Sequence, residues 1–351
     1  MKPTRVVSQG AWVAAFFLMG CGAGEPVIDD APTEHVLARF DTLIAPATGR
    51  IGVVSDMWLA DDGRLWIADR INHRVVALDA DGRELLSMGR EGNGPGELRN
   101  AEALAVSDSG VVVLDFDNNR LQRFGLDGSP AGQTPLGLPQ LGPAEVGARG
   151  DVAVPTMGVG GGLVAVLRPG ASEPVRLGEP LAEPPQMISL PRLREQALRG
   201  EIPVEFRNNV LPILGPGGEL WLVLQAQGTL QHYSPDGSLL WSRPLEDPEV
   251  DSARAAFFAA WQKEVRPSGL PIPWTATTGT LVGSELWLRL GPGEEGRSVI
   301  AVLDAATGKQ VRRLVLALGS PAGPFAVDIE RRVLYVVLPD EAALVRGELP
   351  W

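Results

Sequence analysis

Two short segments of the chain place Asp, Asn and Arg at matching positions. Residues 69–74 (DRINHR) and 115–120 (DFDNNR) each have an Asp five residues and an Asn two residues before an Arg. Short Asx side chains accept hydrogen bonds that close turns, and the planar guanidinium of Arg can bind several oxygens at once. The pattern therefore suits either loop structure or contact with a ligand. The candidate ligand contacts are Arg70 and Asn72, with Glu97 and Arg99 after the glycine-rich residues 92–96.

Metal-binding chemistry has few candidate side chains in this sequence. A three-His zinc site would need all the histidines of the chain, which are His35, His73 and His232. These lie in unrelated segments, so we expect them not to converge. Calcium prefers oxygen ligands, and four residues could face a central channel: Asp56, Glu102, Asn208 and Asp328. No calcium-loop spacing marks them, so the prediction is no cofactor, with calcium left open.

The sequence contains no motif that is typical of nucleophilic catalysis. The chain has no Gly-x-Ser-x-Gly elbow, and its single cysteine is Cys21, near the start. Residues 160–162 (GGG) resemble a phosphate loop only in composition, because no Lys follows them and the residues on both sides are predicted to form strands. We therefore expect a hairpin there.

The elements that must position all these residues are the strands of a repeated unit. Six copies of a turn residue, a variable residue, an aliphatic residue and a large or β-forming residue begin at Gly63, Gly110, Gly150, Gly218, Ser284 and Arg332. Several short strands in a unit of about 40 to 50 residues are typical of one β-propeller blade. The sequence thus predicts an all-β, six-bladed propeller of four-stranded antiparallel blades. The recurring aromatic residues, expected to pack between blades, are Trp66, Trp221, Trp287 and Tyr335.

The last blade lacks a fourth strand, and an unassigned strand lies near the other end of the sequence. Residues 36–43 (VLARFDTL) alternate in polarity and precede the first blade. We predict that they pair on the outside of the sixth blade and close the ring, which would leave no open edge between the first and last blades.

Two insertions interrupt the repeat, at about residues 178–209 and 244–279, where the spacing of the copies lengthens to 68 and 66 residues. The first predicts a short helix over 191–199. The second predicts a helix that Asp247 caps and Pro248 begins, with apolar residues through Val265 at helical spacing. Both insertions follow a fourth strand, so both should lie on one rim of the channel. They add four candidate binding residues: Arg207, Asn208, Trp261 and Trp274.

With residues 92–98 (GNGPGEL), the two Asp-Asn-Arg segments resemble NHL-repeat propellers, clearly over residues 51–130, weakly over 205–350 and poorly over 131–204. In that family such residues mostly build the fold. Lactonases, strictosidine synthase-like proteins and an amidating lyase with metal-bound His use similar six-bladed rings. The resemblance therefore implies the fold and leaves open whether the protein is an enzyme.

The first twenty residues resemble a lipoprotein signal peptide. Lys2 and Arg5 precede a short apolar run that ends in residues 18–21 (LMGC), like a lipobox, so we expect cleavage before Cys21 and lipidation of that cysteine. Gly22 then favours the outer membrane. The expected domains are a signal peptide (1–20), a flexible tether (21–34) and the propeller (35–351).

The composition limits the partners. The formal net charge is −12, and loss of Lys2 and Arg5 would make it more negative, so nucleic acid is not an expected partner. Lipid would attach the protein to a membrane. We expect a binding or scaffold module for an unknown protein, peptide or small molecule. The alternatives are a divalent-metal-dependent lyase or lactonase-type hydrolase that uses the channel, and a subunit of an envelope assembly.

Overall fold

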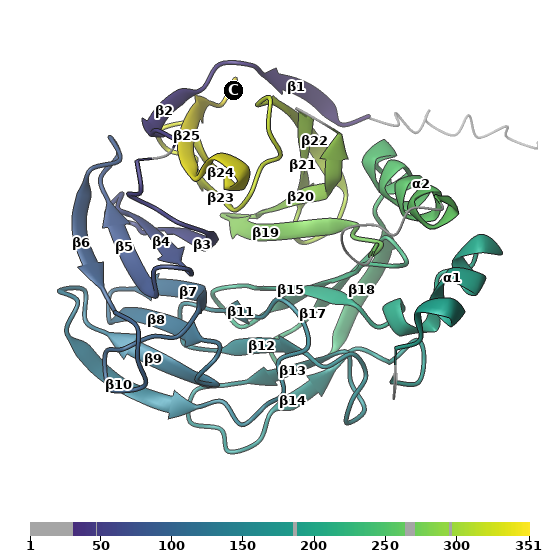
Figure 1. The fold of residues 1–351 in the computed structure, drawn as a ribbon, viewed down its shortest axis with the longest axis horizontal. Helices are drawn as coiled ribbons and strands as arrows, with labels where there is room; N and C mark the ends of the chain where they lie inside the picture. Colours follow the sequence, from purple (N-terminus) through teal and green to yellow (C-terminus); the bar gives the residue numbers. More distant parts are fainter. Residues whose placement is uncertain (1–30, 47, 185–187, 264–270, 295–296) are drawn as a thin grey trace, which may run out of the picture. The chain divides into compact units, whose positions relative to one another are not determined.

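In the computed structural model, residues 31–46, 48–184, 188–263, 271–294 and 297–351 are described. Six sheets, antiparallel except for one outer strand, follow one another around a ring, and the inner strand of each sheet lies nearest the centre (Figure 1). The predicted six-bladed propeller is therefore confirmed. The predicted signal peptide, Cys21 and Val265 lie outside the described residues.

The blades follow the sequence order. Blade one contains β3 (Val54–Leu59), β4 (Leu65–Asp69), β5 (Arg74–Leu78) and β6 (Glu84–Met88). Blade two contains β7 (Ala101–Ser107), β8 (Gly110–Asp115), β9 (Arg120–Phe124) and β10 (Pro130–Pro135). Blade three contains β11 (Glu145–Val146), β12 (Val152–Pro155), β13 (Val164–Leu167) and β14 (Val175–Leu177).

The second half of the ring repeats this order. Blade four contains β15 (Val210–Leu214), β16 (Leu220–Leu224), β17 (Thr229–Tyr233) and β18 (Leu239–Pro244). Blade five contains β19 (Ala276–Val282), β20 (Glu285–Glu294), β21 (Arg297–Asp304) and β22 (Gln310–Ala317). Blade six contains β23 (Phe325–Asp328), β24 (Val333–Leu338) and β25 (Ala343–Glu348).

The hydrophobic core lies mainly between neighbouring blades. The second strands are almost fully buried, and their repeated aromatic side chains contact the next blade. Trp66 packs with Leu104 of blade two, and Tyr335 of blade six packs with Ile67 of blade one. The predicted inter-blade role of these aromatic residues is confirmed, and it explains why the repeat is visible in the sequence.

The ring is not closed by the single strand that we predicted. The segment forms two strands, β1 (Thr33–Leu37) and β2 (Asp41–Ile44). β2 is the fourth strand of blade six, as expected, but β1 pairs parallel to β22 as a fifth strand of blade five. Phe40 lies between them and packs on the core shared by these two blades, against Gly347. The correction has a simple reason: the apolar side chain in the middle fills the seam between two blades.

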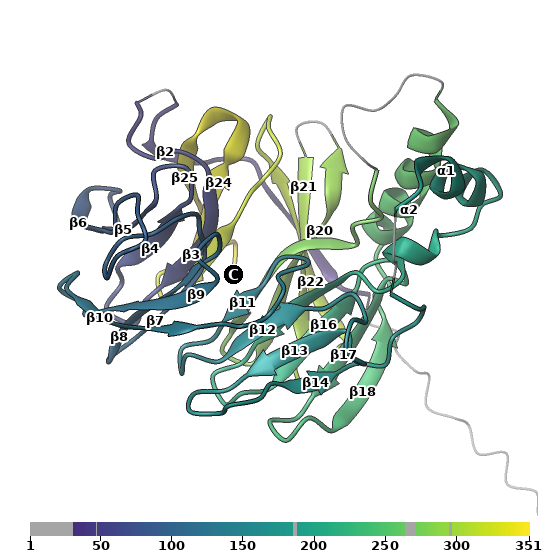
Figure 2. The same cartoon turned by 60° about the horizontal axis from the view of Figure 1, so that its bottom comes forward.

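Both insertions form helices on one side of the ring. α1 (Leu190–Leu198) and the short 3-10 helix η1 (Val204–Phe206) belong to the first, and α2 (Pro248–Gln262) belongs to the second. A second 3-10 helix, η2 (Pro339–Glu341), follows β24. The Asp247 side chain accepts a hydrogen bond from the Glu249 N–H, as predicted for the cap of α2. Figure 2 shows α1 and α2 side by side at one edge of the ring. The insertions therefore share one location, as predicted.

Candidate functional site

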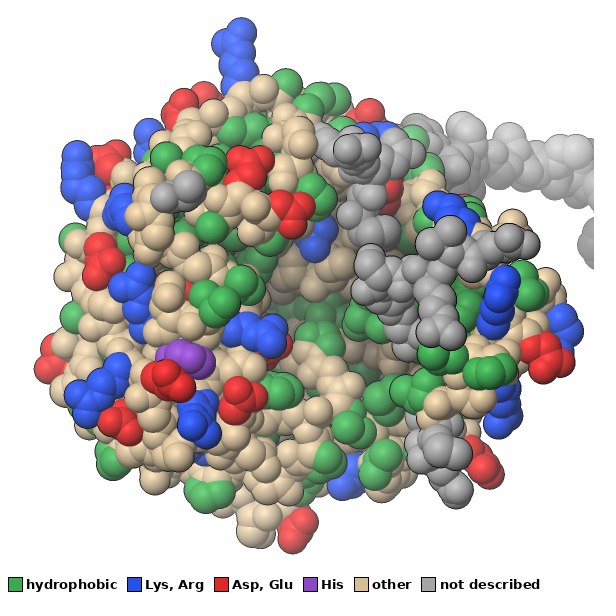
Figure 3. Space-filling view, viewed as in Figure 1, with side chains coloured by type: hydrophobic (Ala, Val, Ile, Leu, Met, Phe, Trp, Pro, Cys, Tyr) green, Lys and Arg blue, Asp and Glu red, His purple; other side chains and the backbone are tan. Residues whose placement is uncertain are grey.

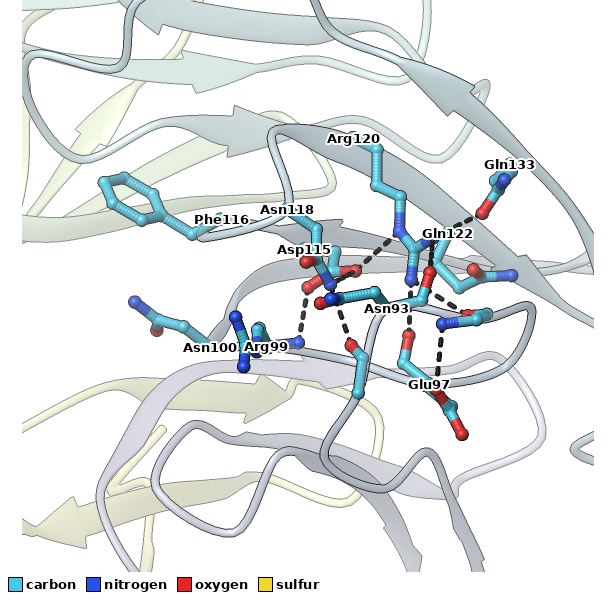
Figure 4. A network of polar contacts seen from close by, with 12 residues as sticks. Asn93, Glu97, Arg99, Asn100, Asp115, Phe116, Asn118, Arg120, Gln122 and Gln133 are labelled. Atoms are coloured by element: carbon cyan, nitrogen blue, oxygen red, sulfur yellow. Dashed lines mark hydrogen bonds and ion pairs between the residues drawn. The ribbon is translucent and has the colours of Figure 1, made fainter.

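The Asp-Asn-Arg segments form hydrogen-bond networks that hold loops together. Arg120 donates through Nε to Asp115 Oδ2 at 2.7 Å and through its other nitrogens to the carbonyl oxygens of Asn93, Gly94 and Glu97 (Figure 4). Asn118 Nδ2 donates to the same Asp115 oxygen at 2.7 Å. Arg120 is buried, and its guanidinium joins the loop before β7 to the end of β8 and also donates to Gln133 on β10.

Blade one repeats the arrangement with longer distances. Asn72 Nδ2 and Arg74 Nε donate to Asp69 Oδ2 at 2.8 and 3.2 Å. Glu97 accepts hydrogen bonds from the Gly94 N–H and from Arg90, which lowers its pKa. The candidates Asn72 and Glu97 thus stabilise turns in the described structure, which is the first of the two roles that we kept open.

The other two loop candidates lie at the surface. The Arg99 N–H donates to Asp115 Oδ1 at 2.6 Å, while its side chain is exposed. Arg70 Nη1 lies 3.8 Å from Glu102 Oε2, and Glu102 lines a cavity on the ring axis. Of the four loop candidates, Arg70 is the one that the structure brings to the edge of that cavity.

The candidates in the insertions are mostly held inside the fold. Asn208 is buried and makes four hydrogen bonds, with the N–H groups of Leu181 and Ala182 and the carbonyl oxygens of Met157 and Ala182. Arg207 Nε donates to the Ile202 carbonyl at 3.0 Å.

The two tryptophans differ. Trp261 is buried between α1 and α2 with Phe257 and Phe206, whereas Trp274 is partly exposed just before β19. A ligand-binding role for these residues stays a prediction. The described hydrogen bonds account for Asn208, whereas the buried Nε1 of Trp261 has no hydrogen-bond partner among the described residues.

The three histidines lie apart. The His35 ring contacts Trp351, His73 Nδ1 accepts from the Asn100 N–H, and His232 stacks on Trp221 at 4.3 Å between ring centroids. Among the described residues, no three His, Cys, Asp or Glu side chains are grouped so that they could hold a metal ion.

The cavity on the axis receives residues from all six blades and has a volume of about 280 Å³. Its walls come from the beginning of each inner strand, the end at which the insertions and the β4–β5 and β8–β9 loops also lie. Figure 3 looks down the ring and shows a hollow at its centre. Most lining residues are small or apolar, including Leu211, Pro212, Ala322 and Pro324. Among the described residues of this lining, four are charged: Asp56, Glu102, Glu145 and Arg289.

The three acids come from β3, β7 and β11, the inner strands of three successive blades. Asp56 accepts hydrogen bonds from the Met57 and Leu104 N–H groups, each at 2.8 Å, so its carboxylate bridges two blades. Burial nevertheless raises the pKa of Asp56 from 3.8 to about 7, and the charge of Glu102 adds to this. Burial, with the nearby Asp56 charge, also raises the pKa of Glu145 well above 4.5. Near neutral pH this pair of acids therefore carries less than its full negative charge.

Arg289 is the single basic side chain among the described residues that line this cavity. Its guanidinium makes no hydrogen bond or ion pair with the described residues, and its Nε atom is fully buried. Burial lowers the pKa of Arg289 to about 10, so the side chain stays charged at neutral pH. It reaches the axis from β20, a second strand, because the inner strand in front of it contributes only Thr277, Thr278 and Gly279.

The sequence analysis found part of this site. It named Asp56 and Glu102 as residues that could face the channel, and both line the cavity. Asp328, named with them, lines a second cavity of about 640 Å³ toward the opposite end of the inner strands, and Asn208 lines neither. Glu145 and Arg289 were missed. A charge inside the apolar run 286–290 (LWLRL) was the available signal for Arg289, whereas β11 is too short to be recognised as a strand.

Comparison with known proteins finds similarity in structure only. No family model matches the sequence, and no curated protein matches it. A calcium-binding regucalcin from Agrobacterium tumefaciens is similar with a TM-score of 0.52 at 12% identity, covering 92% of this chain and 98% of that one.

Two lyases are also similar. A catalytically inactive virginiamycin B lyase from Staphylococcus aureus, solved with quinupristin, has a TM-score of 0.51 at 12% identity and covers 89% of this chain and 100% of that one. A streptogramin B lyase has a TM-score of 0.51 at 13% identity, covering 88% of this chain and 98% of that one. No helix in the described part of the chain is both long and apolar enough to cross a bilayer. At these identities, the comparisons establish that the chain has the six-bladed propeller fold that these proteins share.

Proposed function

We propose that the protein is an exported, lipid-anchored propeller that binds a small organic anion in the axial cavity. The observation that carries the proposal is Arg289, a charged side chain at the cavity wall without a partner among the described residues. Leaving a buried charge unpaired costs several kcal/mol, and a ligand of opposite charge removes that cost. A cavity of about 280 Å³ suits a small molecule.

Export and lipidation rest on the sequence. The apolar run before Cys21 and the lack of any other cysteine support a lipid anchor, and an anchor would keep the cavity outside the cytoplasm. The tether and the propeller together are acidic, and this charge supports a partner other than nucleic acid. An envelope location would give such a module access to solutes from the surroundings.

The binding proposal is tested by thermal shift with acetate, succinate, glutamate and citrate on wild type and on Arg289→Gln. A ligand present at 100 times its Kd stabilises the folded state by about 2.7 kcal/mol, so at least one of these acids should raise the wild-type Tm. Arg289→Gln should be at least as stable as wild type without ligand, because it removes an unpaired charge, and should lose the shift.

Arg90→Gln is the matched control, since the Arg90 side chain is exposed and does not line the cavity. It should keep the full ligand-induced shift. Failure of all four acids to shift wild type, or an equal shift in Arg289→Gln, would contradict the proposal.

A second candidate is a lyase or lactonase-type hydrolase that uses the same cavity. The observation that favours it is the raised pKa of Asp56, about 7, because a carboxyl with this pKa can accept and return a proton at neutral pH. The metal-dependent form fits less well: both Asp56 oxygens already accept backbone N–H groups, and no three possible ligands are grouped among the described residues. Metal analysis of the purified protein distinguishes the two, since a stoichiometric ion lost in Glu102→Gln would support the metal-dependent enzyme.

A further inference from the structure

The charges of the axial cavity are divided between opposite walls. β3, β7 and β11 are neighbours around the ring and carry the three acids. Arg289 belongs to blade five, which lies three positions from blade two in a ring of six (Figure 1). The described contacts include no ion pair between Arg289 and any of these acids. Arg289 and the three acids therefore line the same cavity from different blades without pairing with one another.

The acidic wall is suited to a cation or to a hydrogen-bond donor. Asp56 is fixed in place by two backbone N–H groups, and the side chain of Glu145 makes no hydrogen bond with other described residues. Glu102 is partly satisfied by Arg70 at 3.8 Å, which leaves the other two carboxyls as the part of the wall without a cationic partner. Their pKa values are raised, so near neutral pH the pair carries less than its full charge and would gain from a bound cation.

The walls between the charges are apolar or weakly polar. Leu211 and Pro212 come from β15 on one side, and Ala322 and Pro324 come from the loop before β23 on the other. A ligand that spans the cavity would thus place charged groups at its two ends and a nonpolar body between them.

We infer that the carboxylate ligand of this cavity is a zwitterion, with its carboxylate on Arg289 and its ammonium group on Asp56 and Glu145. This inference rests on the proposed function, because it identifies the chemical class of the molecule whose anionic group binds Arg289. An amino acid with a nonpolar body has the required groups, and the cavity volume of about 280 Å³ accommodates one such molecule. Binding would pair Arg289 at one end of the ligand and Asp56 with Glu145 at the other, which a simple carboxylate or amine could not do.

Calorimetric titration with matched probes tests the inference. The probes are the unbranched ω-amino acids from glycine to 6-aminohexanoate. Each amino acid is compared with two matched probes of equal chain length, a carboxylate without the amino group and an amine without the carboxylate. One amino acid of the series should bind about tenfold or more tightly than both of its matched probes, because charge-assisted hydrogen bonds form at both ends. An optimum in chain length would report the separation of the two walls.

Variants assign the two ends of the ligand. Arg289→Gln should weaken binding of the best amino acid and of its matched carboxylate roughly 10- to 100-fold. Glu145→Gln should weaken the amino acid by about tenfold and leave the carboxylate unchanged. Glu348→Gln, an exposed position on β25, is the control and should change neither affinity.

The outcomes separate this inference from the proposed function. If the carboxylates bind as tightly as the amino acids, and Glu145→Gln changes neither, the zwitterion is wrong while anion binding by Arg289 stands. If amines alone bind, or if no probe binds wild type, both proposals are wrong. Tighter binding of an amino acid that Glu145→Gln abolishes would support both.

Discussion

The side chains that matter most for the proposed function are those that lower the stability of the folded state. Asp56 and Glu145 share one wall of a cavity, and burial raises the pKa of each. A carboxyl whose pKa is higher in the folded than in the unfolded state makes its full contribution to stability below its unfolded pKa, and this contribution is lost as the pH rises from there through the folded pKa. Binding residues kept at such a cost are common at functional sites.

Glu145→Gln should therefore make the protein more stable at pH 8 and weaken its ligand binding. The gain in Tm over wild type should be small near pH 4, where both states of Glu145 are protonated, and should grow as pH rises above the ordinary glutamate value of 4.5. Calorimetric melting of both proteins without ligand, at a series of pH values from 4 to 8, measures the difference. A difference in Tm that is independent of pH, or a Glu145→Gln variant less stable at pH 8, would contradict the assigned pKa direction.

Among the elements, β22 joins the ring closure to the helical insertion. Arg313 on this strand lies 2.6 Å from Glu34 beside it on β1, 3.1 Å from Asp247 and 3.5 Å from Glu249 at the start of α2. Asp247 also caps α2 and accepts from Gln310 at 2.9 Å. One buried guanidinium thus holds the first strand, the fifth blade and the longer helix in a fixed arrangement.

Arg313→Met should lower the free energy of unfolding by about 3–5 kcal/mol, because removing one partner leaves buried acids without their counterion. Urea unfolding followed by circular dichroism measures it. The matched control is Arg83→Met at an exposed turn, whose ion pairs with Asp79 and Asp81 are open to solvent. Equal unfolding midpoints for the two variants would show that the Arg313 cluster does not stabilise the fold.

At the scale of the whole molecule, the ring depends on strands from distant parts of the sequence. Blade six takes three strands from residues 325–348 and its fourth, β2, from residues 41–44. This pairing covers the edge of β25 and places Phe40 in the core between blades five and six. Closure of this kind couples all six blades into one cooperative unit.

Deleting residues 33–44 should therefore reduce cooperative stability more than deleting residues 33–37. The shorter deletion removes β1 from a blade that keeps four strands, whereas the longer one also exposes the edge of β25. Urea unfolding followed by both circular dichroism and tryptophan fluorescence should give coincident curves for wild type and separate curves for the longer deletion. Coincident curves with an unchanged midpoint for that variant would rule out the coupling.

The sequence by itself determined the blades, because their evidence is local. Turn residues and alternating strands recur along the chain, and four of the six copies add an aromatic residue that packs between blades, so the sequence predicted six blades. The cap of α2 by Asp247 and the position of both insertions followed from equally local patterns. The Asp-Asn-Arg segments also revealed their loops, though not whether they bind a ligand.

The site and the ring closure were decided only by the tertiary structure. Asp56, Glu145 and Arg289 lie in different blades, and no periodicity within one blade indicates that they face one cavity. The division of residues 33–44 into two strands depends on the seam that Phe40 fills between blades that are distant in sequence. A local pattern specifies which strands form, whereas side chains meet at the axis only after six blades have closed around it.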